Sequence, residues 1–299
     1  MVKSGFVSLI GRPNVGKSTL LNTLLGQKIS IVTNKPQTTR NVIRGVYNRI
    51  DGKADDCQIV FIDTPGIHKP RTKLGESMTQ AALNTFREVD LILLLVDGGL
   101  PDDPAHRYVL DQLAKVETPK LLAINKIDLL DPESFRSTYE AFRETGLFID
   151  VFGLSALSGK NVPALLKTIV DQMEEGPPYF PESMITDHPE RFLVREIIRE
   201  KALRFLEEEV PHGIAVEIES YEEEPHITKI GAVIYCEKKS HKGIIIGKRG
   251  KKLKGIGKSA REEIEALLGV NVYLSLWVKV RENWRDSRFA LRNLGYHNE

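Results

Sequence analysis

The sequence predicts two domains, an α/β domain with a mostly parallel sheet and helices on both faces, followed by a smaller α+β domain. Between residues 6 and 154, five apolar runs alternate with helix-like or loop stretches: 6–10, 59–62, 91–96, 121–124 and 151–154. Continuous apolar runs are typical of parallel strands that are buried on both faces. After residue 190 the pattern changes to helix, strand, strand, helix, helix, strand (αββααβ).

The domain boundary is predicted from proline. Residues 177, 178, 181 and 189 are prolines, and this density favours an extended, stiff connector over a regular helix. We therefore expect one domain at 1–175, a linker at 176–190 and a second domain at 191–299. At 299 residues the chain is long enough for two hydrophobic cores.

The net charge of +1 hides an uneven distribution. Residues 207–224 hold eight acidic side chains and no Lys or Arg, whereas residues 238–261 hold ten Lys or Arg and no acid. The two cysteines lack metal-ligand spacing, the start of the chain has no signal-peptide pattern, and no apolar run could span a membrane. These features predict a soluble intracellular protein with one strongly basic segment.

A phosphate-loop pattern, G-x-x-x-x-G-K-[ST], follows the first apolar run and precedes a helix with leucines at helical spacing. Its residues are Gly11, Arg12, Pro13, Asn14, Val15, Gly16, Lys17 and Ser18. Glycines let backbone N–H groups curl around phosphate oxygens, and the helix start adds unpaired N–H groups. We expect Lys17 to reach the β- and γ-phosphates and the Ser18 hydroxyl to bind Mg²⁺.

Polar residues at the ends of later strands complete the predicted nucleotide site, because ligands bind beyond the carboxyl ends of parallel strands. Asp63 is expected to hold Mg²⁺ through water, and Gly66 allows a backbone N–H to approach the γ-phosphate. The nucleotide-binding residues after this strand are Asp63, Thr64, Pro65, Gly66 and Ile67.

The base is predicted to be guanine. The Asp128 carboxylate can accept hydrogen bonds from the N1–H and N2 amine of guanine, which adenine lacks. Asn125 would support the O6/N7 side, the Lys126 stem would cover the ring, and the backbone of residues 155–157 would donate to O6. These base-binding residues are Asn125, Lys126, Ile127, Asp128, Ser155, Ala156 and Leu157.

The motifs G-R-P-N-V-G-K-S, P-Q-T-T-R, D-T-P-G-I-H, N-K-I-D and S-A-L resemble the G motifs of the Era family of bacterial Ras-like GTPases. The resemblance implies that residues 28–40 form the first switch and that a second switch runs from Asp63 through residue 80. It also implies that Thr39 coordinates Mg²⁺ in the GTP state, with Thr38 as the alternative. Loss of the γ-phosphate would release both switches.

Slow intrinsic hydrolysis is expected because Ile67 follows D-x-x-G, where a glutamine would orient the attacking water. In related GTPases an asparagine at the position of Asn14 helps to bind K⁺. The alternative is that Asn14 only shapes the loop. The predicted catalytic groups are Lys17, Thr39, Gly66 and Asn14, whereas Asp97, His68 and His106 are interpreted as turn or loop residues, with His106 solvated.

The second domain carries a G-x-x-G loop, which in KH domains clamps about four single-stranded nucleotides beside an apolar groove. The predicted RNA-binding residues are Gly247, Lys248, Arg249, Gly250, Lys251 and Lys252. Ile244, Ile245 and Ile246 are expected in the groove wall and the core. Trp277 and Trp284 are candidates for base stacking, with core packing as the alternative.

The resemblance to the Era family covers both halves of the chain. It implies binding of the 3′ end of the small-subunit ribosomal RNA, help in assembly of that subunit, and, for some members, loose association with the inner membrane. We accordingly expect a cytoplasmic monomer with GTP or GDP and Mg²⁺. Two alternatives are a constitutive RNA-binding protein whose nucleotide site is structural, and a kinase built on the same loop.

Overall fold

The computed structural model describes residues 2–50, 52 and 56–296. Contacts divide the chain into two compact units. The first comprises Met1–Ser30, Thr39–Arg71 and Gly75–Asp187, and the second comprises Ile31–Thr38, Thr72–Leu74 and His188–Glu299. The second unit therefore includes two short segments taken from within the first half of the sequence.

The first unit is built on a six-stranded sheet with strand order β2-β3-β1-β4-β5-β6. Its strands are β1 (Lys3–Gly11), β2 (Ile43–Arg49), β3 (Cys57–Asp63), β4 (Leu91–Val96), β5 (Lys120–Ile124) and β6 (Asp150–Gly153). Every pairing is parallel except that of β2 with β3. The predicted mostly parallel sheet is confirmed.

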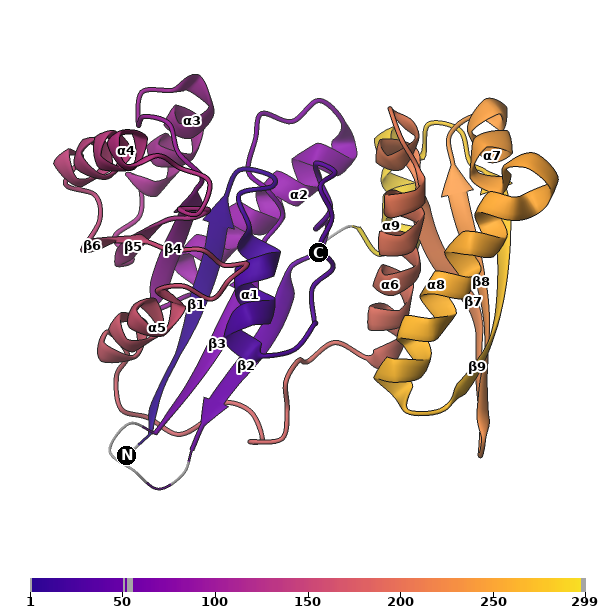
Figure 1. The fold of residues 1–299 in the computed structure, drawn as a ribbon, viewed down its shortest axis with the longest axis horizontal. Coiled ribbons are helices and arrows are strands. Elements are labelled where there is room, and N and C mark those ends of the chain that lie inside the picture. Colours follow the sequence, from indigo (N-terminus) through magenta and orange to yellow (C-terminus); the bar gives the residue numbers. More distant parts are fainter. Residues whose placement is uncertain (1, 51, 53–55, 297–299) are drawn as a thin grey trace. The chain divides into compact units, whose positions relative to one another are not determined.

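Helices cover both faces of this sheet, as Figure 1 shows with α1 in front and α2 behind. They are α1 (Lys17–Leu25), α2 (Lys73–Asn84), α3 (Pro104–Leu113), α4 (Pro132–Glu144) and α5 (Val162–Asp171), with a 3₁₀ turn at Thr85–Arg87. Side chains of α2, α3 and α4 share a buried cluster with β4 residues such as Ile92 and Leu94. On the opposite face α1 packs so closely on β2 that a Cβ at Gly45 would lie 2.5 Å from Leu25 Cδ1.

The strand β2 was not among the five runs predicted from the sequence. It lies at the edge of the sheet, and Arg44 and Arg49 are exposed while Ile43 and Val46 are buried. An antiparallel edge strand needs no continuous apolar run, so the signal used for the buried parallel strands does not find it.

The proline-rich segment forms no regular helix, and it belongs to the first unit as far as Asp187. The Val46 N–H donates to Ile185 O (2.8 Å), which adds backbone pairing to the free edge of β2. The Gln58 side chain donates to Phe180 O (2.8 Å) and accepts from the Tyr179 and Phe180 N–H groups. The boundary between the two compact units therefore lies between residues 187 and 188.

The second unit has the predicted αββααβ order, which confirms the second fold class. Its elements are α6 (Glu190–Phe205), β7 (Ala215–Glu224), β8 (Ile227–Cys236), α7 (Lys239–Ile246), α8 (Lys251–Leu268) and β9 (Asn271–Val280), followed by α9 (Arg288–Asn293). Short 3₁₀ turns lie at Val210–Gly213, Lys248–Gly250 and Trp284–Asp286. The sheet order is β7-β8-β9, with β8 and β9 parallel and β7 antiparallel to β8.

The core of the second unit is apolar and continuous from α6 and α8 to the sheet. It includes Ile198, Ile256, Ile264 and Val278. Trp284 is fully buried, and its Nε1–H donates to Gly213 O (2.9 Å). Of the two tryptophans, Trp284 therefore has the core-packing role. Within the described part of the chain, no helix has the length and apolarity needed to cross a membrane.

Candidate functional site

The phosphate loop joins the end of β1 to the start of α1. Gly11 has φ 145°, and a Cβ there would lie 2.4 Å from Leu95 O on β4, so only glycine fits. Gly16 has φ 103° and precedes the first residue of α1. The predicted strand, glycine loop and helix are therefore present, with the helix N-terminus at the loop, where an anion is favoured.

Lys17 is buried under this loop. Its Nζ donates to Gly11 O (3.1 Å) and Arg12 O (2.9 Å), which holds the ammonium group at the loop. Burial lowers the pKa of Lys17 to about 8, although the charges of Asp63 and Asp97 oppose the shift. The group is still mostly protonated at pH 7, and a bound phosphate would offset the cost of burying its charge.

Three oxygen-bearing side chains predicted as metal ligands meet beside the loop. The Ser18 hydroxyl donates to Asp63 Oδ2 (2.6 Å), and Thr39 Oγ1 lies 2.8 Å from Ser18 Oγ. Thr39 Oγ1 is also 3.5 Å from Asp63 Oδ2. The alternative ligand, Thr38, instead donates to Lys35 O (2.6 Å), so its hydroxyl is engaged within its own loop.

Asp63 carries the observation that fits a cation to this set. Its side chain is fully buried, and within the described residues Asp63 Oδ1 has no hydrogen-bond partner. Burial raises the pKa of the Asp63 carboxyl, while Lys17 and the hydroxyls of Ser18, Ser30 and Thr39 lower it. A carboxylate and two hydroxyls are hard oxygen donors of the kind that Mg²⁺ prefers. The residues present therefore fit magnesium.

The D-x-x-G turn after β3 lies against the phosphate loop. A Cβ at Gly66 would come within 2.6 Å of Pro13 N, so this close approach requires glycine. The Ile67 N–H donates to Gly11 O (3.0 Å), and the Ile67 side chain is fully buried in the core. An apolar side chain pointing into the core has no means of orienting water by a hydrogen bond.

Asn125 ties the base end of the site to the phosphate loop. Its Nδ2 donates to Val15 O (2.7 Å) and its Oδ1 accepts from the Ala156 N–H (2.8 Å). A Cβ at Gly16 would be 2.1 Å from Asn125 Nδ2. The Ala156 N–H, one of the backbone donors expected on guanine O6, thus donates to the Asn125 oxygen in this structure.

Asp128 is exposed at the end of the same loop, so its carboxylate is accessible to a ligand. Lys126 has φ 61°, and its ammonium group forms an ion pair with Asp97 (2.7 Å). The interpretation of Asp97 as a simple turn former missed this partner. The signal was available, because Asp97 directly follows β4 just as Asp63 ends β3 and Asn125 follows β5.

The expectation for His106 was wrong. Its side chain is 3% exposed, Nδ1 lies 3.0 Å from Leu100 O, and its ring is 5.5 Å from the Phe142 ring. Burial lowers the pKa of His106. This is a core histidine on the buried face of α3, packed against a phenylalanine of α4. His68 Nδ1 lies 3.1 Å from Gly66 O, which places this loop residue against the D-x-x-G turn.

Asn14 is exposed at the tip of the phosphate loop with φ 64°. Asparagine is among the few non-glycine residues that adopt this left-handed conformation readily. This backbone geometry accounts for asparagine as a loop-shaping residue, and the exposure leaves its side chain accessible to an ion.

The G-x-x-G loop connects α7 to α8 in the second unit. Gly247 (φ 70°) and Gly250 (φ 74°) both have positive φ, and a Cβ at Gly247 would lie 2.7 Å from Lys252 Cβ. Lys248 and Arg249 are exposed between them, and Lys252 is half-buried against Gly247. The loop therefore presents two exposed cations at the start of an 18-residue helix.

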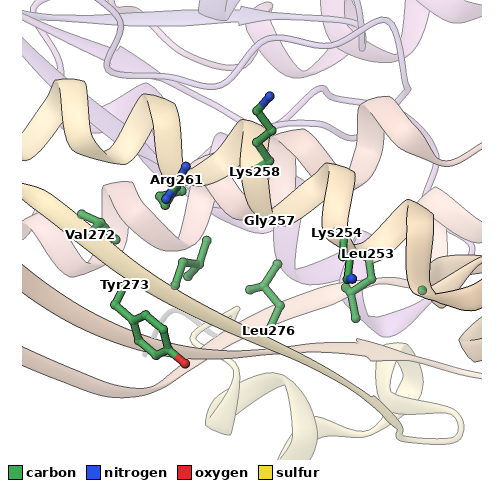
Figure 2. A pocket seen from close by; sticks show the side chains of 10 residues that line it. Leu253, Lys254, Gly257, Lys258, Arg261, Val272, Tyr273 and Leu276 are labelled. Carbon is green, nitrogen blue, oxygen red and sulfur yellow. The ribbon is translucent and has the colours of Figure 1, made fainter.

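A groove of about 480 Å³ runs from this loop between α8 and β9. Figure 2 shows apolar side chains, among them Leu253 and Leu276, between the helix and the strand, with the Tyr273 ring on the strand. The groove is lined by Gly250, Leu253, Lys254, Gly257, Lys258, Arg261, Val272, Tyr273, Leu274 and Leu276. Its floor is apolar and its helix edge carries three exposed cations, which suits bases below and phosphates above.

The expectation for the three isoleucines holds only for the core. Ile245 is fully buried, whereas Ile244 is 42% exposed. The groove walls come from α8 and β9, which both follow the three isoleucines in the chain. Trp277 is 50% exposed on β9, and the groove aromatic is Tyr273, which the sequence did not single out.

Two family models match the chain in the order of its two units. A model described as a 50S ribosome-binding GTPase matches residues 6–126, and a KH-domain model matches residues 209–285. The GTPase Era of Alkaliphilus metalliredigens is 56% identical over 296 residues, which are 98% of this chain and 99% of that protein. The GTPase Era of Clostridioides difficile is 53% identical over 302 residues and the full length of both chains.

The chain belongs to the Era family of GTPases. The family resemblance predicted from the motifs is thereby confirmed.

Solved Era structures agree with the fold end to end. A variant of Aquifex aeolicus Era bound to GDP·AlF₄⁻ is 40% identical, with TM-score 0.94 over 99% of this chain and 100% of that one. An Era complex with MgGDPNP and nucleotides 1506–1542 of 16S ribosomal RNA is 41% identical, with TM-score 0.94 over both full chains. The ligands of these relatives are of the kinds predicted from the sequence.

Proposed function

We propose that this chain is a GTP-hydrolysing switch that binds the 3′ end of the small-subunit ribosomal RNA and assists assembly of that subunit. The observation that carries the nucleotide part is the convergence of Ser18, Thr39 and the partnerless Asp63 oxygen beside the loop that holds Lys17. The RNA part is supported by the groove beside the G-x-x-G loop and by the RNA held by the Era relative.

In the mechanism, the residues of this chain bind and orient the triphosphate. Lys17 and the loop N–H groups hold the β- and γ-phosphate oxygens, and Gly66 admits a backbone N–H to the γ-phosphate. Ser18 and Thr39 would hold Mg²⁺ directly and Asp63 would hold it through water. The ion would supply charge neutralisation of the phosphates. Asp128 selects guanine through two hydrogen bonds.

Hydrolysis is slow in this proposal because the residue after D-x-x-G is buried. Ile67 leaves the attacking water without a hydrogen-bonding side chain from that position. Acceleration must come from a group outside this position, and K⁺ at Asn14 is the candidate within the loop. Equal hydrolysis rates in Na⁺ and K⁺ buffers would exclude the potassium role, since the two ions differ in size but not in charge.

RNA binding is assigned to the groove between α8 and β9. Lys248 and Arg249 would meet phosphates, and Leu276 and Tyr273 would contact bases over about four nucleotides. The acidic stretch of residues 207–224 would repel phosphate and confine the RNA to one face of the unit. We further propose a monomer that works in the cytoplasm, with peripheral contact to the inner face of the membrane as in some Era proteins.

The test combines nucleotide turnover with RNA binding. Single-turnover hydrolysis of GTP should occur in the full chain and be strongly reduced in Lys17→Ala. A fluorescent RNA with the 3′-terminal sequence of 16S ribosomal RNA should bind more tightly than a permuted RNA of equal length and composition. Absence of turnover would favour the constitutive RNA-binding alternative, and equal affinity for both RNAs would contradict the ribosomal assignment.

A further inference from the structure

The helix α6 buries charged side chains that a surface helix would normally expose. Glu196, Arg199, Glu200 and Lys201 are 2%, 0%, 0% and 6% exposed, and we call these four residues the α6 charge cluster. Arg199 forms an ion pair with Glu196, and Lys201 Nζ lies 3.3 Å from Glu200 Oε2. Burial of charged groups costs free energy unless they are paired or hydrogen-bonded. Four buried charged side chains on one helix therefore require an explanation.

The α6 charge cluster holds the segment Ile31–Thr38, which belongs to the same compact unit. The Val32 N–H donates to Glu200 Oε1 (3.1 Å) near the start of the segment. Arg199 Nη2 donates to Thr38 O (2.5 Å) at its end. Ile31 packs in the apolar core of this unit at 2% exposure.

The segment ends one residue before a predicted magnesium ligand. Thr38 is the last residue of the segment, and Thr39 belongs to the first unit. Thr39 Oγ1 lies 2.8 Å from Ser18 Oγ of that unit. Adjacent Cα atoms are held about 3.8 Å apart across a trans peptide. The Thr38 carbonyl and the Thr39 N and Cα atoms also lie in one planar peptide unit, so a displacement of this carbonyl moves the Thr39 Cα with it.

We propose that Arg199 and Glu200 are positioning residues that hold the first switch so that Thr39 reaches the magnesium site. This inference rests on the proposed function, in which Thr39 contacts Mg²⁺ when the γ-phosphate is present. The buried charges of α6 are then part of the nucleotide switch, although they lie far from the G motifs in the sequence.

The experiment compares affinities for fluorescent GDPNP and GDP, both with Mg²⁺, in the full chain. The variant Glu196→Gln/Arg199→Met removes the donor to Thr38 together with the charge that it neutralises. We expect the GDPNP affinity to fall about tenfold, the value of one charge-assisted hydrogen bond, with the GDP affinity unchanged within about twofold. A merely structural role would lower both affinities or neither.

The matched control is Glu237→Gln/Arg285→Met, which removes another partly buried ion pair of the second unit (Arg285 Nε to Glu237 Oε2, 3.0 Å). This pair does not contact Ile31–Thr38 through any described bond, so both affinities should stay unchanged. If the control reproduces the selective loss, the positioning role is wrong. Should the α6 double variant fail to fold, Glu200→Gln weakens the Val32 contact, and a loss confined to GDPNP is again expected. Equal loss for both nucleotides in that variant would overturn the inference.

Thr39→Ala separates this inference from the proposed function. If Thr39→Ala leaves the GDPNP affinity unchanged, the assignment of Thr39 as a magnesium ligand fails. If Thr39→Ala lowers it but the α6 double variant does not, only the positioning role fails. When Thr39→Ala is added to the α6 double variant, the combined loss should equal that of Thr39→Ala alone, because both changes act through one contact.

Discussion

The nucleotide site and the RNA groove differ in how far the protein organises them before a ligand arrives. At the nucleotide site Lys17 and Asp63 are buried and hydrogen-bonded to fixed neighbours. At the groove Lys254, Lys258 and Arg261 are exposed on α8 above an apolar floor. The first site is preorganised for one ligand, whereas the second attracts a polyanion through cations that are exposed to water.

This difference predicts two kinds of failure. A change at the nucleotide site removes a buried interaction that nothing else can replace, so its effect should be large and weakly dependent on salt. A change at the groove removes one of several cations, so its effect should be smaller and should depend steeply on salt.

The largest effect is expected for Lys17→Ala, which removes the only loop side chain predicted to hold the β- and γ-phosphates. Single-turnover hydrolysis should fall by about 10²–10³, the typical loss for one preorganised charge-stabilising group. Lys167→Ala, on the exposed face of α5, serves as the control and should hydrolyse at the parental rate. A loss below tenfold in Lys17→Ala would contradict the preorganised site.

The base-selecting role of Asp128 predicts the next largest effect. Asp128→Asn replaces one acceptor with an amide donor that faces the donor N2 amine of guanine. Loss of charge-assisted bonds should weaken GDP binding by about 10². Xanthosine diphosphate, which carries a carbonyl at that position, should bind the variant better than GDP does. Calorimetric titration with both nucleotides checks this, and an unchanged preference for guanine would remove Asp128 from the base site.

At the groove, Lys248→Ala/Arg249→Ala should weaken binding of single-stranded RNA and lower the slope of log K against log [salt] by about 1.4, which corresponds to two phosphates. The control variant Lys229→Ala/Lys279→Ala changes two exposed lysines that are paired with Glu224 and Glu219. It should leave the slope unchanged. An unaltered slope in the loop variant would show that the phosphates lie elsewhere.

The smallest effect concerns pH at Lys17. Phosphate binding favours the protonated ammonium, so affinity is full below the pKa of about 8 and decreases as pH rises through it. From pH 7 to 8.5 the Kd for GDP should rise about fourfold. Lys17→Arg keeps its proton over this range and should show a flat profile. A flat profile in the parental protein would mean that burial does not lower this pKa.

The phosphate loop and the motifs that begin at Asp63, Asn125 and Ser155 were predictable because each lies where a short, continuously apolar run ends. The strand β3 is buried along its whole length and ends at Asp63, so its position was evident from local sequence. The edge strand β2 and the buried ring of His106 were not predictable in this way. Their burial is set by partners distant in the chain, such as Phe142 for His106.

The proline-rich segment and the helix α6 show the same limit. Proline density predicts an extended backbone, but the pairing of Ile185 with Val46 assigns that backbone to the first unit. The charges of α6 resemble a solvated face in the sequence. Only the contacts of Arg199 and Glu200 with Ile31–Thr38 identify them as buried.

The two fold classes, the guanine-nucleotide motifs and the G-x-x-G loop could be predicted from local patterns, because local composition controls strand burial, glycine turns and helix starts. The tertiary structure decided which residues lie together across long separations. It engaged Asn125 with Val15 and Ala156, gave the groove its walls from α8 and β9, and placed Ile31–Thr38 against α6. Such pairings depend on packing between distant segments, which no local pattern encodes.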